Sequence, residues 1–352
     1  MGFTWAWSGL WPGAEPVPNG WIILDKPLGL GSTQAVSAVK RVCREAGLGK
    51  VKVGHGGTLD PLATGVLPIA LGEATKLTGR MLDGDKVYAF TVAFGAQTDT
   101  LDLEGAVIAT SDERPALAAI EAVLLRFTGP IEQVPPAYSA LMVDGQRAYD
   151  LARAGEAVEL AGRRVTVHSL TILPGTGRGT AEGGGGGSPQ NVSSLDGDSP
   201  LHHPADGPPP RSGEEEITLI AHVSKGTYIR SLARDIALAL GTVGHVTMLR
   251  RTKAGPFTLE QAISLDKLNE VGKGAPLENV LLPLEAGLDD IPALTLSPEQ
   301  ASMARQGRVL TGLTQDDGLY WAKAGHVPVA LMEIFSGEAK VVRGFNLSDV
   351  AE

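Results

Sequence analysis

Residues 54–65 read GHGGTLDPLATG, a stretch with four glycines, one histidine and a single acidic residue, Asp60, directly before Pro61. Glycine lets a backbone turn sharply or approach a ligand closely, and an Asp-Pro step is common in turns. The surrounding residues 52–72 predict a strand followed by a long structured loop. Two interpretations of Asp60 are open: a turn residue, or a carboxylate that a rigid loop presents to a substrate.

The segments around this loop alternate between strand and helix patterns. Residues 20–27 (GWIILDKP) predict a buried strand that runs into a turn. A helix is expected from about residue 32 to 46, with Ser32 or Thr33 as its N-cap. Further elements are predicted as strands at 86–95, 163–173, 216–223 and 245–257, as helices at 113–129 and 229–240, and as short strands with glycine turns after about 290. These elements together predict an α+β fold with a mixed or antiparallel sheet.

One internal segment breaks this pattern. Of the 43 residues from 174 to 216, 11 are glycine and 7 are proline. Such a composition cannot bury enough apolar surface to order itself. We therefore predict a flexible surface insertion at about 174–215 that interrupts a hairpin, because ordered patterns flank it on both sides.

Composition narrows the class of protein. The chain has 352 residues, 43% of them hydrophobic, and its lone cysteine, Cys43, occupies an apolar helix position. A structural role for that thiol and a reducing cytoplasm are expected. No stretch approaches the ~20 apolar residues that span a bilayer, and the first 19 residues, read as an N-terminal extension, carry no basic residue typical of a signal peptide.

The formal net charge of −10 by itself argues against a nucleic-acid partner, but the charge is uneven. Residues 36–55 sum to +4 and residues 220–255 to +5, whereas residues 256–352 sum to −7. A locally basic face on an acidic protein can attract phosphates. Two solvated helix faces would give the same counts, so this observation leaves both interpretations open.

Common cofactor and metal signatures are missing from the sequence. It has no GxxxxGK[ST] loop, no GxSxG elbow and no zinc-ligand spacing, and the pair His202-His203 lies in the glycine- and proline-rich segment. Ordinary side chains must then supply any chemistry. The polar candidates are Asp60, Tyr88, Lys26 and Arg230; their structural alternatives are a turn, core packing and an ion pair between Arg230 and Asp235 or Asp60.

Five segments in order resemble the bacterial tRNA pseudouridine-55 synthase family, also called TruB. They are ILDKPLGLGS, GHGGTLDPLATGVLPIALGEATK with DGDKVYAF and GAQTDTLDLEG, QVPPAYSALMVDGQRAYDLARAG, VSKGTYIRSLARDIALALG, and HVTMLRRTKAGPF. The resemblance spans about residues 20 to 260 apart from the insertion. It implies a pseudouridine synthase catalytic domain over 20–285 with a thumb-like RNA-binding insertion at about 130–160. The tail, 290–352, is similar to a PUA domain with weaker support.

The resemblance also implies roles for single residues. Asp60 would be the catalytic aspartate, attacking the ribose or the base of a flipped uridine. Tyr88 would stack on that uridine and act in proton transfer, and Arg230 would pair with Asp60 and hold it ionised. The residues expected to support the pocket or contact RNA are Lys26, Pro27, His55, Gly57, Tyr228 and Leu249.

This activity would convert the uridine of the tRNA T loop to pseudouridine by base flipping. Because the isomerisation adds and removes no atom or electron, no cofactor or metal is expected. The implied partner is the T arm of tRNA, with no membrane, no obligate protein partner and a monomeric, cytoplasmic enzyme. Two alternatives stay open: an RNA-folding helper whose catalysis is secondary, and a glycosidase, which would need a second acid near Asp60.

Overall fold

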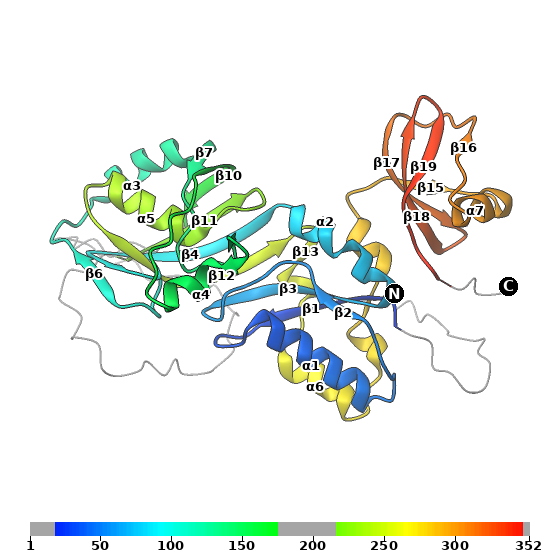
Figure 1. Ribbon diagram of the computed structural model, residues 1–352, viewed down its shortest axis with the longest axis horizontal. Coiled ribbons are helices and arrows are strands. Elements are labelled where there is room, and N and C mark those ends of the chain that lie inside the picture. The colour runs from blue at the N-terminus through cyan, green and yellow to red at the C-terminus, as the bar shows by residue number, and fades with distance from the viewer. Residues whose placement is uncertain (1–17, 175–215, 348–352) are drawn as a thin grey trace, which may run out of the picture.

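The computed structural model describes residues 18–174 and 216–347, which form one long sheet flanked by helices and a smaller sheet at the C-terminal end (Figure 1). The predicted N-terminal extension, 1–19, and the predicted insertion, 174–215, lie almost entirely outside the described residues.

The long sheet has ten strands in the order β14-β1-β3-β12-β4-β11-β10-β7, with β2 beside β3 and β13 beside β12. Strand β12 runs parallel to β3, and the other neighbouring strands are antiparallel. This is the mixed sheet of the predicted α+β fold. The strands are β1 Gly20–Lys26, β2 Val53–His55, β3 Ala63–Leu71, β4 Lys86–Phe94, β7 Gly129–Gln133, β10 Arg163–Ile172, β11 Glu216–Val223, β12 Gly244–Ala254, β13 Phe257–Thr258 and β14 Leu282–Pro283.

Helices cover the two halves of this sheet separately. Helices α1 (Ser32–Glu45) and α6 (Leu265–Gly272) lie side by side next to β1 and β2 (Figure 1). Helices α3 (Leu117–Leu124) and α5 (Ile229–Ala239) pack on β4, β10 and β12. Each half of the sheet has its own apolar core. In each core, aliphatic side chains of the strands pack against those of the covering helices.

Smaller elements extend from this frame. Two short ribbons pair β5 (Ala96–Thr98) with β6 (Val107–Thr110) and β8 (Met142–Val143) with β9 (Gln146–Arg147). The short helices are α2 Thr78–Asp83 and α4 Ala148–Arg153. The second ribbon and α4 fall inside the region predicted to be a thumb, whose boundaries stay a prediction.

The small C-terminal β-rich domain predicted from the tail is present as a five-stranded sheet in the order β15-β17-β18-β19-β16, consistent with a PUA-like fold. Its elements are β15 Ala293–Thr295, α7 Pro298–Arg305, β16 Leu310–Thr311, β17 Gly318–Ala324, β18 Val327–Phe335 and β19 Glu338–Gly344. It touches the main body through Lys76, whose ammonium donates to the Gly344 carbonyl at 2.9 Å, and through an ion pair of 2.5 Å between Arg80 and Asp290. The exact division near 285–290 stays a prediction.

The predicted N-cap of the first helix was wrong. Helix α1 is capped by Gly31, whose N–H donates to the Gln34 side chain at 2.7 Å, and Ser32 is the first helical residue. Ser32 is not free to cap because its hydroxyl binds Leu59, as described below. The helix predicted at 113–129 is also shorter, since it spans only α3 and one 3-10 turn.

Other local predictions are confirmed. Cys43 is buried in α1, and burial raises the pKa of its thiol to about 11, so it behaves as an apolar core residue. Strands β10 and β11, on either side of residues 175–215, pair antiparallel as expected for a hairpin. Among the described residues, no helix combines the length and the apolar character needed to cross a membrane.

Candidate active site

The loop that carries Asp60 joins β2 to β3 at the centre of the long sheet. Just after the loop, Ala63 lies opposite Leu249 and Gly65 opposite Arg251 in the parallel pair of β3 and β12. On its other side, β12 places Arg251 opposite Tyr88 of β4. Strand pairing therefore gathers residues from three distant parts of the sequence around one loop.

The loop is fixed to the start of helix α1. The Ser32 hydroxyl accepts from the Leu59 N–H at 2.8 Å and donates to the Leu59 carbonyl at 2.9 Å. The Gly29 N–H donates to the Pro61 carbonyl at 2.8 Å. Two backbone positions that flank Asp60 are thus held by the main body, so the carboxylate projects from a constrained segment.

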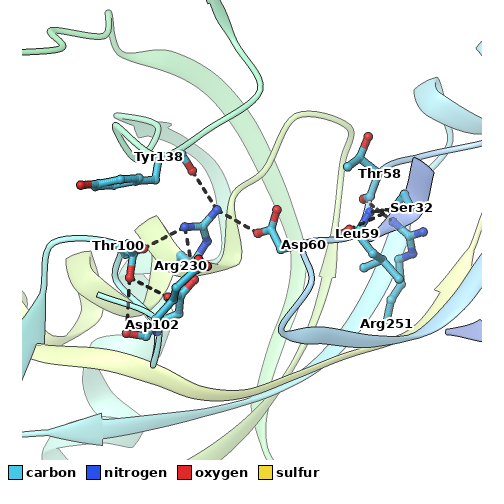
Figure 2. A network of polar contacts seen from close by, with 10 residues as sticks. Ser32, Thr58, Leu59, Asp60, Thr100, Asp102, Tyr138, Arg230 and Arg251 are labelled. Carbon is cyan, nitrogen blue, oxygen red and sulfur yellow. Dashed lines mark hydrogen bonds and ion pairs between the residues drawn. The ribbon is translucent and has the colours of Figure 1, made fainter. Parts of the chain in front are cut away.

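Arg251, a residue of β12, fastens the loop through its buried side chain. This side chain is only 1% exposed and donates from Nε to the Val66 carbonyl at 2.8 Å. Its Nη1 and Nη2 donate to the carbonyls of Thr58 at 3.2 Å and Gly57 at 3.1 Å. A guanidinium offers five N–H groups in a rigid fork, so one buried cation ties strand β3 to the first half of the loop. Figure 2 shows Arg251 near Thr58 and Leu59 on its right.

Lys26 supports the other half of the loop. It is fully buried, and its ammonium donates to the carbonyls of Leu30 at 2.6 Å, Pro27 at 3.0 Å and Pro61 at 3.3 Å. Burial lowers the pKa of Lys26 to about 8, and the negative charge of Asp60 counteracts part of that shift. Lys26 therefore acts on the loop through backbone carbonyls and does not face the cavity.

Arg230 reaches the site from the first turn of α5 and joins Asp60 to two other segments. Its Nη2 lies 2.8 Å from Asp60 Oδ2 and donates to the Tyr138 carbonyl at 3.0 Å (Figure 2). Its Nη1 donates to the Thr100 carbonyl at 2.8 Å. The guanidinium thus fixes the direction of the catalytic candidate and links it to Thr100 and to Tyr138, the second of which lies within the predicted thumb.

A second carboxylate balances the buried guanidinium. Asp102 Oδ2 lies 3.4 Å from Arg230 Nη1, and Asp102 Oδ1 accepts from the Thr100 hydroxyl at 2.6 Å and the Glu104 N–H at 3.0 Å. Its side chain is 11% exposed, whereas that of Asp60 is 43% exposed. The buried acid is therefore occupied with Arg230 and its own loop, and Asp60 is the acid that faces solvent.

A cavity of about 290 Å³ lies against Asp60. Its walls include six of the nine residues predicted for the site, namely Gly57, Asp60, Tyr88, Tyr228, Arg230 and Leu249. This volume is just below the usual range of small-ligand sites, about 300–1,000 Å³. Six of the residues that the family resemblance grouped as one site thus share one concave surface.

The two tyrosines of the cavity are held differently. Tyr88 packs its ring between the two apolar cores of the sheet. Tyr228 is fixed through its backbone, because the Gln133 amide donates to the Tyr228 carbonyl at 3.1 Å and accepts from its N–H at 2.8 Å. The Arg163 guanidinium lies 4.7 Å from the centre of the Tyr228 ring. Among the described residues neither phenol hydroxyl has a hydrogen-bond partner, so both are available to a ligand.

The three other predicted residues, Lys26, Pro27 and His55, do not line the cavity. Pro27 contributes its carbonyl to Lys26. His55 ends strand β2, and its Nδ1 accepts from the Gly57 N–H at 3.4 Å. Burial, with the charge of Arg251, lowers the pKa of His55, so the imidazole is neutral near pH 7. Its predicted role in filling the gap left by a flipped base stays a prediction.

Sequence reasoning missed Arg251, Lys86 and Asp102. Lys86 is 7% exposed and lines the cavity, and its ammonium donates to the carbonyls of Leu82 at 2.6 Å and Gly84 at 2.5 Å. Burial lowers the pKa of Lys86 to about 8. The available signal was a cation at the start of one strand pattern, Lys86 in KVYAF, and inside another, Arg251 in TMLRRTKA, because a buried cation rarely occurs without a partner.

Solved structures share this architecture. A chain from the structure of an H/ACA RNP bound to a substrate RNA containing 2′-deoxyuridine aligns with a TM-score of 0.62 and 22% identity, covering 94% of this chain and 86% of that one. A chain from the archaeal box H/ACA sRNP Nop10-Cbf5 complex aligns with a TM-score of 0.61 and 23% identity, covering 95% and 88%. At these identities the comparison establishes that the chain shares the fold of these structures.

Sequence comparison identifies the family. Profiles described as the TruB family pseudouridylate synthase N-terminal domain and the tRNA pseudouridylate synthase B C-terminal domain match residues 44–180 and 230–289. The tRNA pseudouridine synthase B of Novosphingobium aromaticivorans is 67% identical over 95% of this chain and 99% of its own length. That of Zymomonas mobilis is 55% identical over 96% and 99%. The chain belongs to the TruB family of pseudouridylate synthases, as its sequence motifs predicted.

Proposed function

We propose that this protein isomerises uridine 55 in the T loop of tRNA to pseudouridine and that Asp60 is its catalytic residue. The observation that carries the proposal is the contact of 2.8 Å between Arg230 Nη2 and Asp60 Oδ2 at the wall of the cavity. It combines a buried cation with an accessible carboxylate on a fixed loop. Relatives at 67% and 55% identity that are named tRNA pseudouridine synthase B support the same activity.

Asp60 supplies the nucleophilic group of the proposed reaction. The bond between C1′ and N1 of the uridine breaks, the base turns within the cavity, and C5 bonds to C1′. C5 then loses its proton and N1 gains one, so atoms and electrons balance without a cofactor. Asp60 Oδ2 is bound to Arg230, whereas Oδ1 accepts no hydrogen bond from any described residue. The carboxylate can therefore attack either the ribose or the base.

The cavity walls hold the detached base in place. Tyr88 and Tyr228 offer aromatic faces to a pyrimidine, and Leu249 supplies an apolar wall. Flipping the uridine out of its stack costs about a few kcal/mol, and stacking on an aromatic ring recovers about 1–3 kcal/mol per base. We assign Tyr88 to stacking and proton transfer because it lines the cavity and its hydroxyl has no hydrogen-bond partner among the described residues.

Cations around the cavity suit the backbone of an RNA ligand. Arg163 and Lys86 both line it, and the Arg163 guanidinium also donates to the Gly226 carbonyl at its edge. The predicted thumb, about 130–160, borders the same site, since the Tyr138 carbonyl binds Arg230 and Ser139 lines the cavity. We assign the T arm of tRNA as the ligand of this face, where phosphates would meet Arg163.

The glycosidase alternative requires a second acid in the cavity. Asp102 is the carboxylate that shares Arg230 with Asp60, but it accepts hydrogen bonds from Thr100 and Glu104 and is not among the cavity walls. These contacts suit a carboxylate that balances the charge of Arg230 and not an acid that donates a proton to a leaving group. We therefore favour the isomerase. We propose that it acts in the cytoplasm as a monomer without an obligate protein partner. The protein partners in the archaeal Nop10-Cbf5 structure belong to that complex.

The direct test compares wild type with Asp60→Asn on an unmodified tRNA transcript. The variant keeps the shape of the side chain and one acceptor for Arg230 while removing the nucleophile. We expect tRNA affinity within about threefold of wild type and no pseudouridine after a single turnover. A variant that forms pseudouridine at the wild-type rate would exclude Asp60 as the catalytic residue. Equal promotion of tRNA refolding by both proteins would reveal a separate folding role.

A further inference from the structure

Three side chains with metal-binding atoms meet on the surface beside the cavity, outside the site described above. They are Asp85, from the turn before β4, His168 of β10 and His222 of β11. Their ligand atoms all lie within 4.8 Å of one another. His168 Nε2 is 3.1 Å from Asp85 Oδ2, and His222 Nε2 is 3.7 Å from the same oxygen. Both imidazoles therefore point at one carboxylate.

The backbone is built to bring His168 into this position. In the pairing of β10 with β11, Val167 lies opposite Val223 and Ser169 lies opposite His222, so His168 is the extra residue of a β-bulge. A bulge re-aims the side chain of its extra residue and is often found next to a functional site. In a regular ladder continued from the pair of Val167 and Val223, His168 would lie directly opposite His222. With the bulge the two side chains stay neighbours, and their rings lie 4.7 Å apart at a tilt of 47°.

We propose that Asp85, His168 and His222 bind one Zn²⁺ ion or a similar divalent transition metal. Imidazole nitrogen and carboxylate oxygen are ordinary zinc ligands, at about 2.0–2.2 Å from the metal. Tetrahedral ligands at that distance are roughly 3.3 Å apart, between the two measured separations of 3.1 and 3.7 Å. Three protein ligands leave the fourth position to water, and the side chains of Asp85 and His222 are 48% and 39% exposed, so the metal can enter from solvent.

The position of the cluster indicates what a bound metal would do. Asp85 directly precedes Lys86, and His222 directly precedes Val223 and Ser224; all three of these neighbours line the cavity. The metal would cross-link the turn before β4 to the hairpin of β10 and β11. It would thereby fix one edge of the cavity without contacting the reacting atoms, so it is a structural site and not a catalytic one. The linear sequence hides it because its residues come from three separate segments.

Metal binding is tested on the full-length, untagged protein freed of metal by a chelator. We expect one equivalent of Co²⁺ to give the visible absorption of a tetrahedral site and Zn²⁺ to displace it. His168→Gln, His222→Gln and Asp85→Asn should each lower Zn²⁺ affinity at least roughly tenfold. Their melting temperatures without metal should equal that of wild type, because the side chains are partly exposed. Zn²⁺ should raise the melting temperature of wild type and not of His168→Gln.

The matched control replaces two consecutive histidines elsewhere in the chain, His202 and His203, with glutamine; these two lie outside the described residues. This double variant should bind Co²⁺ and Zn²⁺ as wild type does. The proposal is wrong if wild type binds neither ion stoichiometrically at micromolar concentrations, if the double variant loses the site, or if His168→Gln and His222→Gln bind as tightly as wild type. In each of those cases the three side chains form only a hydrogen-bonded cluster.

Discussion

Arg230 and Asp60 are 170 residues apart in the sequence, yet their side chains meet at 2.8 Å. The Arg230 side chain is 7% exposed and that of Asp60 is 43% exposed. The contact therefore joins a buried side chain, Arg230, to a side chain at the cavity, Asp60, and Arg230 sets the position of Asp60. Because Arg230 also binds the carbonyls of Thr100 and Tyr138, the same side chain connects the loop of Asp60 with two other segments.

Arg230→Lys should preserve the charge and lose the geometry. A lysine ammonium cannot reach all four of the oxygens that Arg230 contacts, so buried carbonyls lose their donor. We expect the free energy of unfolding to fall by about 1–3 kcal/mol and pseudouridine formation to slow at least roughly tenfold. Chemical denaturation and single-turnover kinetics measure the two effects.

Arg234→Lys is the matched control for this change. Arg234 lies one helical turn further along α5, and it pairs with the adjacent Asp235 at a side-chain exposure of 20%. The substitution should alter the free energy of unfolding by less than about 1 kcal/mol and leave turnover unchanged. Equal losses in both variants would mean that any arginine on this helix is needed, which would contradict a special role for Arg230.

Tyr88→Phe separates stacking from proton transfer. The ring and its packing between the two cores remain, so tRNA affinity should stay near that of wild type. If the hydroxyl transfers a proton, turnover should fall by about 10²-fold or more. Tyr320→Phe, in the C-terminal sheet, is the control and should leave turnover unchanged. An unchanged rate for Tyr88→Phe would restrict this residue to stacking.

Lys26 should give the protein a distinctive response to alkaline pH. An exposed lysine keeps its proton up to a pKa of 10.5, whereas Lys26 in the folded protein loses it at a pKa of about 8. Between these values the unfolded chain binds more protons, so this residue makes the free energy of unfolding rise with pH. Below about pH 8 Lys26 is charged in both the folded and the unfolded protein. The folded protein then carries the full cost of burying the charge, which is roughly 3 kcal/mol from the size of the pKa shift.

Lys26→Met tests this dependence. The difference in unfolding free energy between wild type and Lys26→Met should move in favour of wild type from pH 8 to pH 10.5, as measured by urea denaturation at each pH. Lys86, which has a similar pKa of about 8, is present in both proteins and cancels from the difference. A difference that stays constant over this range would show that Lys26 is not perturbed by burial.

Gly65→Ala tests the close approach of β3 to β12 behind the loop. Gly65 has φ of +101°, and a Cβ there would lie 2.2 Å from the Arg251 carbonyl oxygen. We expect a loss of about 2–4 kcal/mol in the free energy of unfolding. Gly79→Ala, in helix α2 with no atom near the added methyl, should be neutral or slightly stabilising. Equal effects at both positions would contradict the proposed steric cause.

The sequence could predict those parts of the fold that local patterns determine. Alternation identified β4, and a stripe of small apolar residues including Ala35, Val39 and Cys43 identified α1, because each pattern lies within one element. The family resemblance brought Asp60, Tyr88 and Arg230 together as a site before any geometry was known. The structure supports that grouping by placing all three at one cavity.

The supporting residues could not be predicted because their roles depend on strand register. Arg251 and Arg250 are neighbours in β12, yet Arg251 is buried beneath the loop while Arg250 pairs with Asp25 at 2.7 Å near the surface. Only the pairing of β12 with β3 decides which arginine meets the loop. The same holds for Ser32, whose hydroxyl suits a helix cap by local rules but is used by Leu59 across 27 residues.

The most direct test of the central claim is to map pseudouridine, nucleotide by nucleotide, in an unmodified tRNA transcript incubated with the purified protein. The account predicts stoichiometric conversion of uridine 55 by wild type, none by Asp60→Asn, and none in a transcript with cytidine at position 55. Pseudouridine at another position only, or no pseudouridine from a protein that binds the T arm, would contradict it.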